Sequence, residues 1–513
     1  MNNKYIGLGT LMGFCLSCWQ YDKEHCGNNL GDASCPEGQF CDACNAQNNG
    51  CVDQQPAPGC YIMTAGSDGA STSDPGTTTT TPPPPPTTTT AVVDDSADTS
   101  SGPTDPTSET AEPPCASDVD CPDAGQPFCD PQGQCVACSD LADPNDACTQ
   151  ADPQNPVCSA GTCVQCTADQ PGECGGQTPV CNPDVNQCAP CTEHTHCPQS
   201  ACHLDGTFVG SCFDPGDVLQ ITDTNELTTA LDLLGEMDQA VFVLTPGAYT
   251  TNLGIGAQIE LAIINSDPEQ QIVIIGNLGG VDTIGVYSQA LVYLSHVTVS
   301  NFLGSSISCS DASLWLDDSE VANSDELGMN LFQNCSTHLR RAAVTSNALG
   351  GINALGGEVV IHNSLIALNG SSLFSFIGGL QFNGTVLNVA YSTIVANEST
   401  NAARGSLFCT GIESGHIRNS IIASDGDSID GCNSIDLENN AVDDLLEIGA
   451  NVYVGPVMPS WFLSTELSNY RLSAAGQGLL ADIAQWEEGD PLTDIDGQPI
   501  PMVSPSFPGL DQP

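Results

Sequence analysis

Basic residues are almost missing from this sequence. It contains seven Lys and Arg against 63 Asp and Glu, a formal net charge of −56, and no Lys follows Lys23. Phosphate groups are bound mainly through Lys and Arg, which release the condensed counterions. Such an acidic chain would be repelled by nucleic acid and by anionic lipid surfaces, so neither is expected as a partner.

A hydrophobic run long enough to cross a bilayer is also missing. The apolar run Ile6 to Leu16 has 11 residues, whereas a spanning helix needs about 20. It follows Lys4 and precedes polar residues, which is the layout of a signal peptide. Leu16-Ser17-Cys18 resembles the end of a bacterial lipobox, although Cys15 replaces the expected Leu. Residues 1–18 are therefore predicted to be a signal peptide, with simple cleavage or lipidation at Cys18 as the alternatives.

Cysteine is abundant, with 28 residues, and this indicates a disulfide framework in an exported protein. Residues 19–63 hold six cysteines and few aliphatic residues, so disulfides must stabilise this Cys-rich mini-domain. Residues 64–114 are rich in Thr and Pro and include the run Pro82 to Pro86, which favours an extended, disordered linker. The mature chain is expected outside the cell or on the cell surface, where an outer-membrane lipoprotein is one possibility.

Residues 115–212 contain an internal repeat. The phrase x-Pro-apolar-Cys, a short polar turn and C-x-x-C recur three times, which divides sixteen cysteines into four units. Two bridges per unit are the simplest connectivity, and three pairings remain open in each unit. The units are Cys115/121/129/135, Cys138/148/158/163, Cys166/174/181/188 and Cys191/197/202/212.

Two metal readings of this repeat compete with the disulfide reading. Pairs of C-x-x-C, such as Cys135 and Cys138, can form a zinc ribbon, but this leaves the intervening cysteines unexplained. Asp118, Asp120 and Asp123 have a D-x-D-x-x-D spacing that could supply oxygen ligands to calcium. A solvated acidic turn is the simpler interpretation of these three residues.

Residues 213–513 begin with one predicted short helix, Asn225 to Leu234, capped by Thr222 or Thr224. Short β-branched runs follow, and two aliphatic columns repeat along them five residues apart, at intervals of 22 to 28 residues. This period predicts a solenoid of short parallel strands, with like positions stacked about 4.8 Å apart. The first column is Leu294, Leu316, Leu339, Ile361, Val389 and Ile417, and the second is Val299, Val321, Val344, Ile366, Ile394 and Ile422.

Two polar columns accompany the aliphatic ones. Small residues lie between the two aliphatic columns, at Ser319, Ala342, Ser364, Ser392 and Ser420. Asn347, Asn369 and Asn397 follow the second column by three residues. Asn is expected there because it tolerates left-handed backbone angles and because its amide can bond to the next coil.

This region, about residues 222–500, resembles right-handed parallel β-helix proteins of the pectate-lyase-like superfamily. An opening phrase, Val241 to Tyr249, and a closing phrase, Asn469 to Leu472 with Asp494 to Pro499, are similar to the ends of that fold. The resemblance implies a mainly β chain whose Cys-rich repeats precede a β-helix, as in bacterial secreted or lipoprotein-type surface proteins. Members of that superfamily include polysaccharide lyases, hydrolases and adhesins, so the fold does not fix the activity.

A possible active site follows from the outward-facing column. Asp317, Arg340 and His362 would lie one above another on an exposed sheet, with His338 and His416 on the same side. The resemblance implies that such a surface can perform sugar-acid chemistry, with Asp or a metal holding a carboxylate and Arg or His moving a proton. The alternative is a structural ladder in which Asp317 pairs with Arg340. The lack of Lys excludes the lysine-dependent mechanisms of this superfamily.

Calcium is the one cofactor that the last 300 residues suggest. Asp425, Asp427 and Asp430 form a second D-x-D-x-x-D loop, without the bidentate Glu of an EF-hand. Two cysteine pairs are separated by about one coil and are disulfide candidates. They are Cys309 with Cys335 and Cys409 with Cys432.

Two functions remain open on the sequence. The stalk-like arrangement and the poverty of catalytic residues favour a non-enzymatic module that binds extracellular glycans or surface proteins. The alternative is a calcium-assisted polysaccharide lyase that acts through Asp317, Arg340 and His362. Its difficulty is electrostatic, because an anionic substrate would be repelled unless calcium bridged it.

Overall fold

The computed structural model describes residues 115–511 with short gaps, and nearer the amino terminus only the antiparallel pair β1 (Phe40–Cys41) and β2 (Cys51–Val52). The gaps are residues 122, 124, 172–173, 199, 278–280, 372, 374, 401–404, 412–413, 425–427, 444–449, 456–458, 466–468 and 503–504. The predicted signal peptide with Cys18, most of the predicted mini-domain and the predicted linker thus lie outside the described residues. Among the helices of the described part, none has the length and apolar character needed to cross a bilayer.

Four disulfide units occupy residues 115–212, and each has two bridges. The first Cys pairs with the third and the second with the fourth, so all eight bonds remain within the four expected groups. Small hairpins and one helix surround the bridges. They are β3 (Phe128–Cys129), β4 (Cys135–Val136), α1 (Pro144–Ala151), β5 (Val157–Ser159), β6 (Thr162–Val164), β7 (Val180–Asn182) and β8 (Gln187–Ala189).

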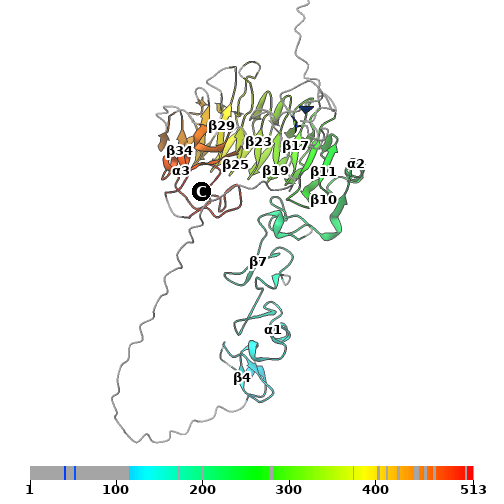
Figure 1. The fold of residues 1–513 in the computed structure, drawn as a ribbon. Helices are drawn as coiled ribbons and strands as arrows, with labels where there is room; N and C mark the ends of the chain where they lie inside the picture. Colours follow the sequence, from blue (N-terminus) through cyan, green and yellow to red (C-terminus); the bar gives the residue numbers. More distant parts are fainter. Residues whose placement is uncertain are drawn as a thin grey trace, which may run out of the picture. The chain divides into compact units, whose positions relative to one another are not determined.

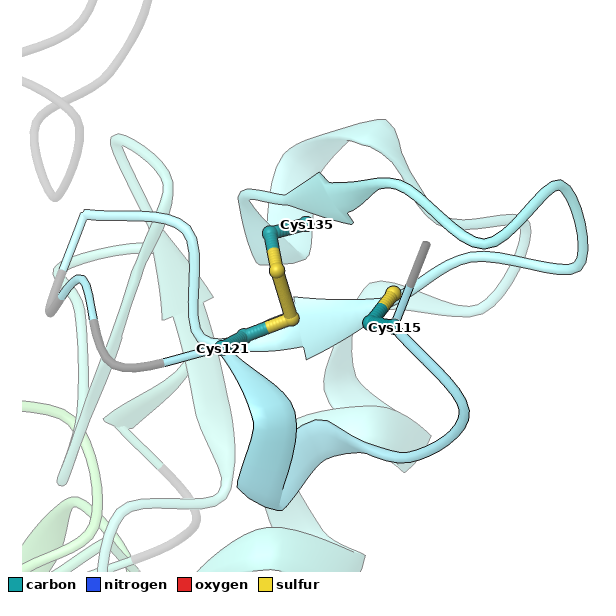
Figure 2. Close-up of side chains that lie close together, drawn as sticks. All are labelled: Cys115, Cys121 and Cys135. Atoms are coloured by element: carbon teal, nitrogen blue, oxygen red, sulfur yellow. A yellow bond between two sulfur atoms is a disulfide. The ribbon is translucent and has the colours of Figure 1, made fainter. Parts of the chain in front are cut away.

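The disulfide pairing separates the two cysteines of each C-x-x-C. Cys135 bonds to Cys121, whereas Cys138 bonds to Cys158 in the next unit. Three sulfur atoms still gather within 4.8 Å in every unit, as Figure 2 shows for Cys115, Cys121 and Cys135. All three belong to bridges, and zinc is bound by thiolates rather than by disulfide sulfur.

The rest of the described chain is a parallel β-helix, whose coils follow one another from β10 to β34 in Figure 1. Each full coil contributes one strand to each of three parallel sheets, and every strand pairs with the strand one coil later. The first sheet contains β9 (Val218–Ile221), β10 (Gln239–Leu244), β13 (Glu260–Asn265), β16 (Leu291–Ser295), β19 (Ser313–Asp317), β22 (Ser336–Arg340), β25 (Glu358–His362), β28 (Val386–Ala390), β31 (Gly415–Arg418) and β34 (Asp436–Val442).

The other two sheets complete each coil. The second sheet contains β11 (Gly247–Thr250), β14 (Ile272–Ile275), β17 (Thr298–Ser300), β20 (Glu320–Ala322), β23 (Ala343–Thr345), β26 (Leu365–Ala367), β29 (Thr393–Asn397), β32 (Ile421–Ser424) and, through β34, β35 (Ala450–Tyr453). The third sheet contains β12 (Leu253–Ile255), β15 (Ile284–Tyr287), β18 (Ile307–Ser310), β21 (Leu327–Phe332), β24 (Gly350–Leu355), β27 (Leu380–Asn383), β30 (Leu407–Thr410) and β33 (Ile429–Asp430).

The predicted aliphatic columns are confirmed residue by residue. Leu294 pairs with Leu316, and the series continues to Ile417 without a slip. Val299 likewise pairs with Val321, and that series ends at Ile422. Both columns are buried in one continuous core, because the aliphatic side chains of each coil stack on those of the next.

The asparagine column forms the expected bonds between coils, but its backbone conformation differs from the expectation. Asn347, Asn369 and Asn397 are buried, and the side-chain amide of Asn347 donates to Asn369, which donates to Asn397 (2.9 and 3.0 Å). The bonds between coils are thus confirmed. The expectation of left-handed backbone at these Asn is wrong: Ser346 and Leu368, each one residue earlier, have the positive φ angles (56° and 60°). Each Asn side chain points inward and bonds to the Asn of a neighbouring coil, and the residue before it has the left-handed backbone of the turn.

The solenoid ends are closed by short elements. Helix α2 (Thr224–Leu233) covers the first coils, as expected, but its cap is Asp223 rather than a Thr, because the Asp223 carboxylate accepts from the backbone of Asn225 and Glu226. Helix α3 (Ala474–Leu480) follows the hairpin β36 (Phe462–Ser464) and β37 (Asn469–Leu472) at the other end. Disulfides Cys309–Cys335 and Cys409–Cys432 join adjacent coils, as their spacing predicts.

Candidate functional site

The predicted column of candidate catalytic residues is present in the first sheet. Asp317 ends β19 and pairs in register with Arg340 at the end of β22, which pairs with His362 at the end of β25. The stacking of these three residues, predicted from the periodicity, is therefore confirmed. Their surroundings differ from the expectation in one important respect.

The column is not an exposed ladder, because the fourth disulfide unit (residues 191–212) packs on it. The Asp317 side chain is 2% exposed and that of Arg340 is 24% exposed. Ala201 and Phe213 from this part of the chain share a buried cluster with Val241, Val243 and Tyr293 of the first sheet. The expected open surface is thus occupied by the chain's own disulfide unit. No periodicity within the solenoid could have indicated this, because the two partners are far apart in sequence.

Arg340 uses its whole guanidinium group in this interface. Its Nε and Nη2 donate to the two carboxylate oxygens of Asp317 (2.9 and 2.7 Å). Its Nη1 donates to the backbone carbonyl of Thr192 in the fourth unit (2.7 Å). Burial raises the pKa of Asp317, and the Arg340 charge opposes that rise. Such a bidentate pair holds the ladder and the disulfide unit together.

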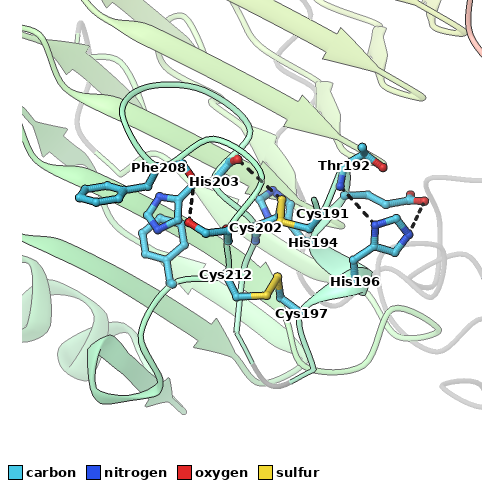
Figure 3. Close-up of a disulfide and its surroundings, with 12 residues drawn as sticks. Cys191, Thr192, His194, His196, Cys197, Cys202, His203, Phe208 and Cys212 are labelled. Atoms are coloured by element: carbon cyan, nitrogen blue, oxygen red, sulfur yellow. Dashed lines mark hydrogen bonds and ion pairs between the residues drawn. A yellow bond between two sulfur atoms is a disulfide. The ribbon is translucent and has the colours of Figure 1, made fainter. Parts of the chain in front are cut away.

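His194 of η7 (His194–His196) is a second residue of the fourth unit that lies close to this pair. Its Nδ1 accepts a hydrogen bond from the backbone N–H of Cys202 (3.1 Å), as Figure 3 shows. Its Nε2 lies 3.9 Å from the Asp317 carboxylate and has no hydrogen-bond partner. Burial lowers the pKa of His194 to about 3, so the ring is neutral at ordinary pH. Nothing in the repeat pattern distinguished this histidine.

A second histidine joins the fourth unit to the first sheet. The His203 ring stacks on Phe213, with centroids 3.7 Å apart. Its Nδ1 lies 2.5 Å from a carboxylate oxygen of Glu260 in β13. Tyr293 donates to the same carboxylate (3.2 Å). The unit is therefore fixed to the solenoid by polar contacts at both Arg340 and Glu260 and by an apolar cluster.

The other histidines of the face are partly buried. Trp315 and His338, which are neighbours in register, stack face to face with ring centroids 3.9 Å apart. Burial lowers the pKa of His362 to about 4, and nearby His338 and His416 lower it further. The three imidazoles are thus neutral near pH 7. A neutral His362 has the protonation state of a general base, but its neighbour Arg340 is fully engaged.

A second row lies one residue beyond the predicted column, at the turn from the first sheet to the second. His296, Asp318 and Arg341 occupy it in successive coils, all with left-handed backbone (φ 57°, 49° and 51°). Arg341 donates to both carboxylate oxygens of Asp318 (2.7 Å each) and to Glu193 of the fourth unit (3.1 Å). The sequence interpretation missed this row, although it follows directly from counting one position further along the same repeat.

A groove runs beside this turn row, between the fourth unit and the solenoid. Three adjoining hollows of about 310, 350 and 440 Å³ share His296 as a lining residue. Asp318 lines two of them, and His194 and Thr195 of the fourth unit line the second. Residues Thr493 to Gly497 close the third hollow from the carboxyl-terminal side. Asp318, Arg341 and Glu193 at its rim are already paired with one another.

The carboxyl-terminal segment covers later coils of the same face. Arg418 of β31 contacts Glu487 (2.5 Å) and Asp490 (2.8 Å), and the Asn419 amide bonds to the carbonyl of Gln485 (2.9 Å). Asn363 donates to the backbone of Thr493. The fourth unit and the carboxyl-terminal segment therefore both pack on the face that the sequence suggested as an active site.

The candidate calcium ligands are only partly placed. Asp425 and Asp427 lie outside the described residues, and Asp430 is in β33. In the first unit, Asp120 accepts from the backbone N–H groups of Ala116 and Ser117, which hold its pKa below the usual value. Asp118 accepts from the N–H of Cys129 (2.8 Å) and Asp123 from that of Gly125 (2.9 Å). These three carboxylates act as turn and cap acceptors.

Comparison with known proteins finds one matching family model and several similar solved structures. A model described as a family of unknown function (DUF8331) matches residues 99–218, a segment that contains all sixteen cysteines of the four units. No curated protein matches the chain. Among solved structures, the pectate lyase Pel9A is 13% identical, with a TM-score of 0.34, over 57% of this chain and 95% of that one.

The pectin methylesterase from Aspergillus niger is a further similar structure. It is 12% identical, with a TM-score of 0.27, over 48% of this chain and 94% of that one. The strand register described above is what identifies the β-helix. Similarities at this level say nothing about activity. Ten disulfides among the described residues indicate a protein of an oxidising, extracellular environment.

Proposed function

We propose that this protein is an extracellular, non-enzymatic binding module whose β-helix recognises glycans. The observation that carries the proposal is the pairing of buried Asp317 with Arg340, whose guanidinium is also bonded to Thr192. A catalytic Arg must be able to reach a substrate. Arg340 has its charge-bearing nitrogens committed to protein acceptors, so it is better suited to holding the fold together than to chemistry.

The remaining parts of the chain fit display rather than turnover. Four disulfide units and a Thr/Pro-rich segment precede the solenoid, and lipidation at Cys18 would attach such a chain to a membrane surface. Calcium bound at Asp425, Asp427 and Asp430 would act as a structural ion of the last coils. Both points belong to the proposal. The partner is a glycan of the surroundings, with surface proteins as the alternative.

The test uses the full chain and a panel of immobilised neutral and acidic polysaccharides, with and without calcium. Retention on a polymer is measured together with the absorbance of unsaturated products. We expect retention without product. Product that appears only with calcium, and disappears in Arg340→Ala with His362→Ala, would instead make the protein a lyase. Absence of both retention and product would direct the search to protein partners.

A further inference from the structure

The outer face of the third sheet lacks charge across seven coils. Strands β12, β15, β18, β21, β24, β27 and β30 contain no Asp, Glu, Lys, Arg or His among their described residues. In the whole sequence about one residue in eight is acidic, and the charged side chains of the first sheet have no counterpart here. An uncharged surface of this length is therefore a distinct feature of the molecule.

Polar amides and hydroxyl groups form a row along this face. Ser308, Asn330, Asn353 and Gln381 occupy successive coils in strict register, and Phe408 follows them. All five side chains point outward and are partly exposed. The Asn353 amide donates to the Asn330 carbonyl oxygen (3.0 Å), so part of the row is held in a fixed orientation. Successive groups are spaced by about 4.8 Å, the distance between neighbouring strands.

Aromatic and apolar side chains lie in the parallel row beside the amides. Tyr287 begins it at 46% exposure, the small Ser310 follows in the next coil, and Phe332 and Leu355 continue it in register. The Tyr287 ring lies against Gly254 and Gly256, where a Cβ would come within 2.7 and 2.4 Å of it. These two glycines leave room for the ring. The face thus combines a supported aromatic surface with fixed hydrogen-bonding groups.

We propose that this outer face of the third sheet binds a neutral glycan, an inference that rests on the proposed function and locates it. Sugar hydroxyl groups match amides and hydroxyls that both donate and accept, and the apolar faces of sugar rings match Tyr287 and Phe332. A carboxylated or sulfated polymer would meet the charge of −56 with no basic residue on the face to offset it. The repeating geometry fits an extended, repeating ligand.

A neutral glycan fits better than a second copy of this chain. Two copies joined face to face would bring two large negative charges together, and this repulsion opposes association. A neutral polymer carries no such cost. Self-association through this face is nevertheless a measurable outcome and is included in the test.

The experiment compares two isosteric substitutions in the full chain. Gln381→Glu places a carboxylate at the last amide of the row, whereas Gln271→Glu makes the same change beside His296, at the rim of the groove. Retention is measured on insoluble neutral polysaccharides, namely a β-1,4-glucan, a β-1,3-glucan, a mannan and chitin. We expect Gln381→Glu to weaken binding about tenfold or more, because a charge must be desolvated and a donor is lost. Gln271→Glu should bind as the unsubstituted chain does.

A second variant guards against a folding defect. Tyr287→Ala removes the aromatic surface without adding charge, and it should weaken retention while the thermal unfolding midpoint and the β-sheet circular dichroism remain unchanged. Weakening by Gln271→Glu alone would place the glycan in the groove, which overturns this inference and leaves the proposed function standing. Retention only on acidic polymers would overturn the neutral ligand. Retention on no polymer would overturn the proposed function as well.

Self-association is followed on the same samples by light scattering. A monomer supports the proposal. A dimer that Gln381→Glu converts to monomers would show that a second copy occupies the face, and the glycan assignment would be abandoned.

Discussion

Arg340 donates two hydrogen bonds to Asp317 and one to Thr192, and these bonds determine how substitutions here change stability. Asp317 is buried and depends on the two nitrogens of Arg340 for charge compensation. A buried carboxylate that loses its partner carries the full cost of desolvation, whereas removal of both charges leaves a less unfavourable site. The contribution of the pair is therefore best seen by comparing single and double substitutions.

We expect Arg340→Ala to lower the free energy of unfolding by about 3 kcal/mol, because Asp317 would remain buried and unpaired. The double variant Asp317→Ala with Arg340→Ala should lose less than the sum of its two single variants. Urea unfolding followed by circular dichroism measures all three. Additive losses would show that the two side chains do not act as a pair. Retention on glycans should be unchanged in every variant that folds.

The buried asparagine ladder is the second feature of the residue scale. The Asn369 amide donates to Asn397 and to the carbonyl of Val344, and its own oxygen accepts from Asn347. Asn369→Ala leaves several buried groups without partners, at a cost of about 1–3 kcal/mol for each group that stays unsatisfied. We expect a clear fall in the urea midpoint. Asn277→Ala, at an exposed turn, should change the midpoint much less.

At the scale of elements, the sequence predicted the register of the solenoid strands but not the segments that pack on the outside of the solenoid. Leu339 and Ile361 had to stack, because a slip of one residue would turn the buried side chains of a strand outward. The cover over Asp317 has no such signal: Thr192 and Arg340 are 148 residues apart, and their contact depends on how a separate unit docks. A repeat pattern predicts the interior of the solenoid, but it does not predict which segments pack against the outside.

The fourth unit should respond to acid through His194. Its pKa in the folded chain is about 3, below its unfolded value of 6.5, so the unfolded chain binds the extra proton first. The stabilisation is complete above pH 6.5 and is lost progressively as the pH falls toward 3. Between pH 7.5 and 5.0 we expect the loss from this group to be about 2 kcal/mol.

The variant His194→Asn separates this effect from other titrations. Its side-chain oxygen can accept the N–H of Cys202, and it carries no proton in this range. Unfolding by urea at both pH values should show a smaller difference for His194→Asn than for the unsubstituted chain. Burial also lowers the pKa of His362, and this acts in the same direction in both proteins. Equal differences would contradict the assignment to His194.

The bridge Cys197–Cys212 should keep the fourth unit in place. It closes a loop with a sequence separation of 15, which corresponds to about 3 kcal/mol of entropic stabilisation. We expect Cys197→Ser with Cys212→Ser to make residues 191–212 a site of rapid proteolysis while the solenoid stays folded. The matched control is Cys174→Ser with Cys188→Ser, with a separation of 14 in the third unit. Cleavage within 191–212 in that control would show that the units depend on one another.

At the scale of the whole molecule, charge is the dominant property. With 63 acidic and seven basic residues, most carboxylates repel one another more than they are attracted to anything in the chain. Arg340 joins the fourth unit to the solenoid by a hydrogen bond to Thr192, and Arg341 does so by an ion pair with Glu193. Arg418 joins the carboxyl-terminal segment by an ion pair with Glu487. These three Arg are thus placed where separate parts of the chain meet.

We expect salt to stabilise this molecule. Raising NaCl from 0.01 to 0.15 M shortens the Debye length from about 30 to about 8 Å, which screens repulsion between carboxylates on the surface. Buried pairs such as Asp317–Arg340 are screened much less, so the net effect should be a higher thermal midpoint. Calcium and magnesium at equal ionic strength then separate screening from specific binding. An excess of stabilisation by calcium that disappears in Asp425→Asn with Asp427→Asn would identify those carboxylates as ligands, and a midpoint that falls with added NaCl would contradict the dominance of repulsion.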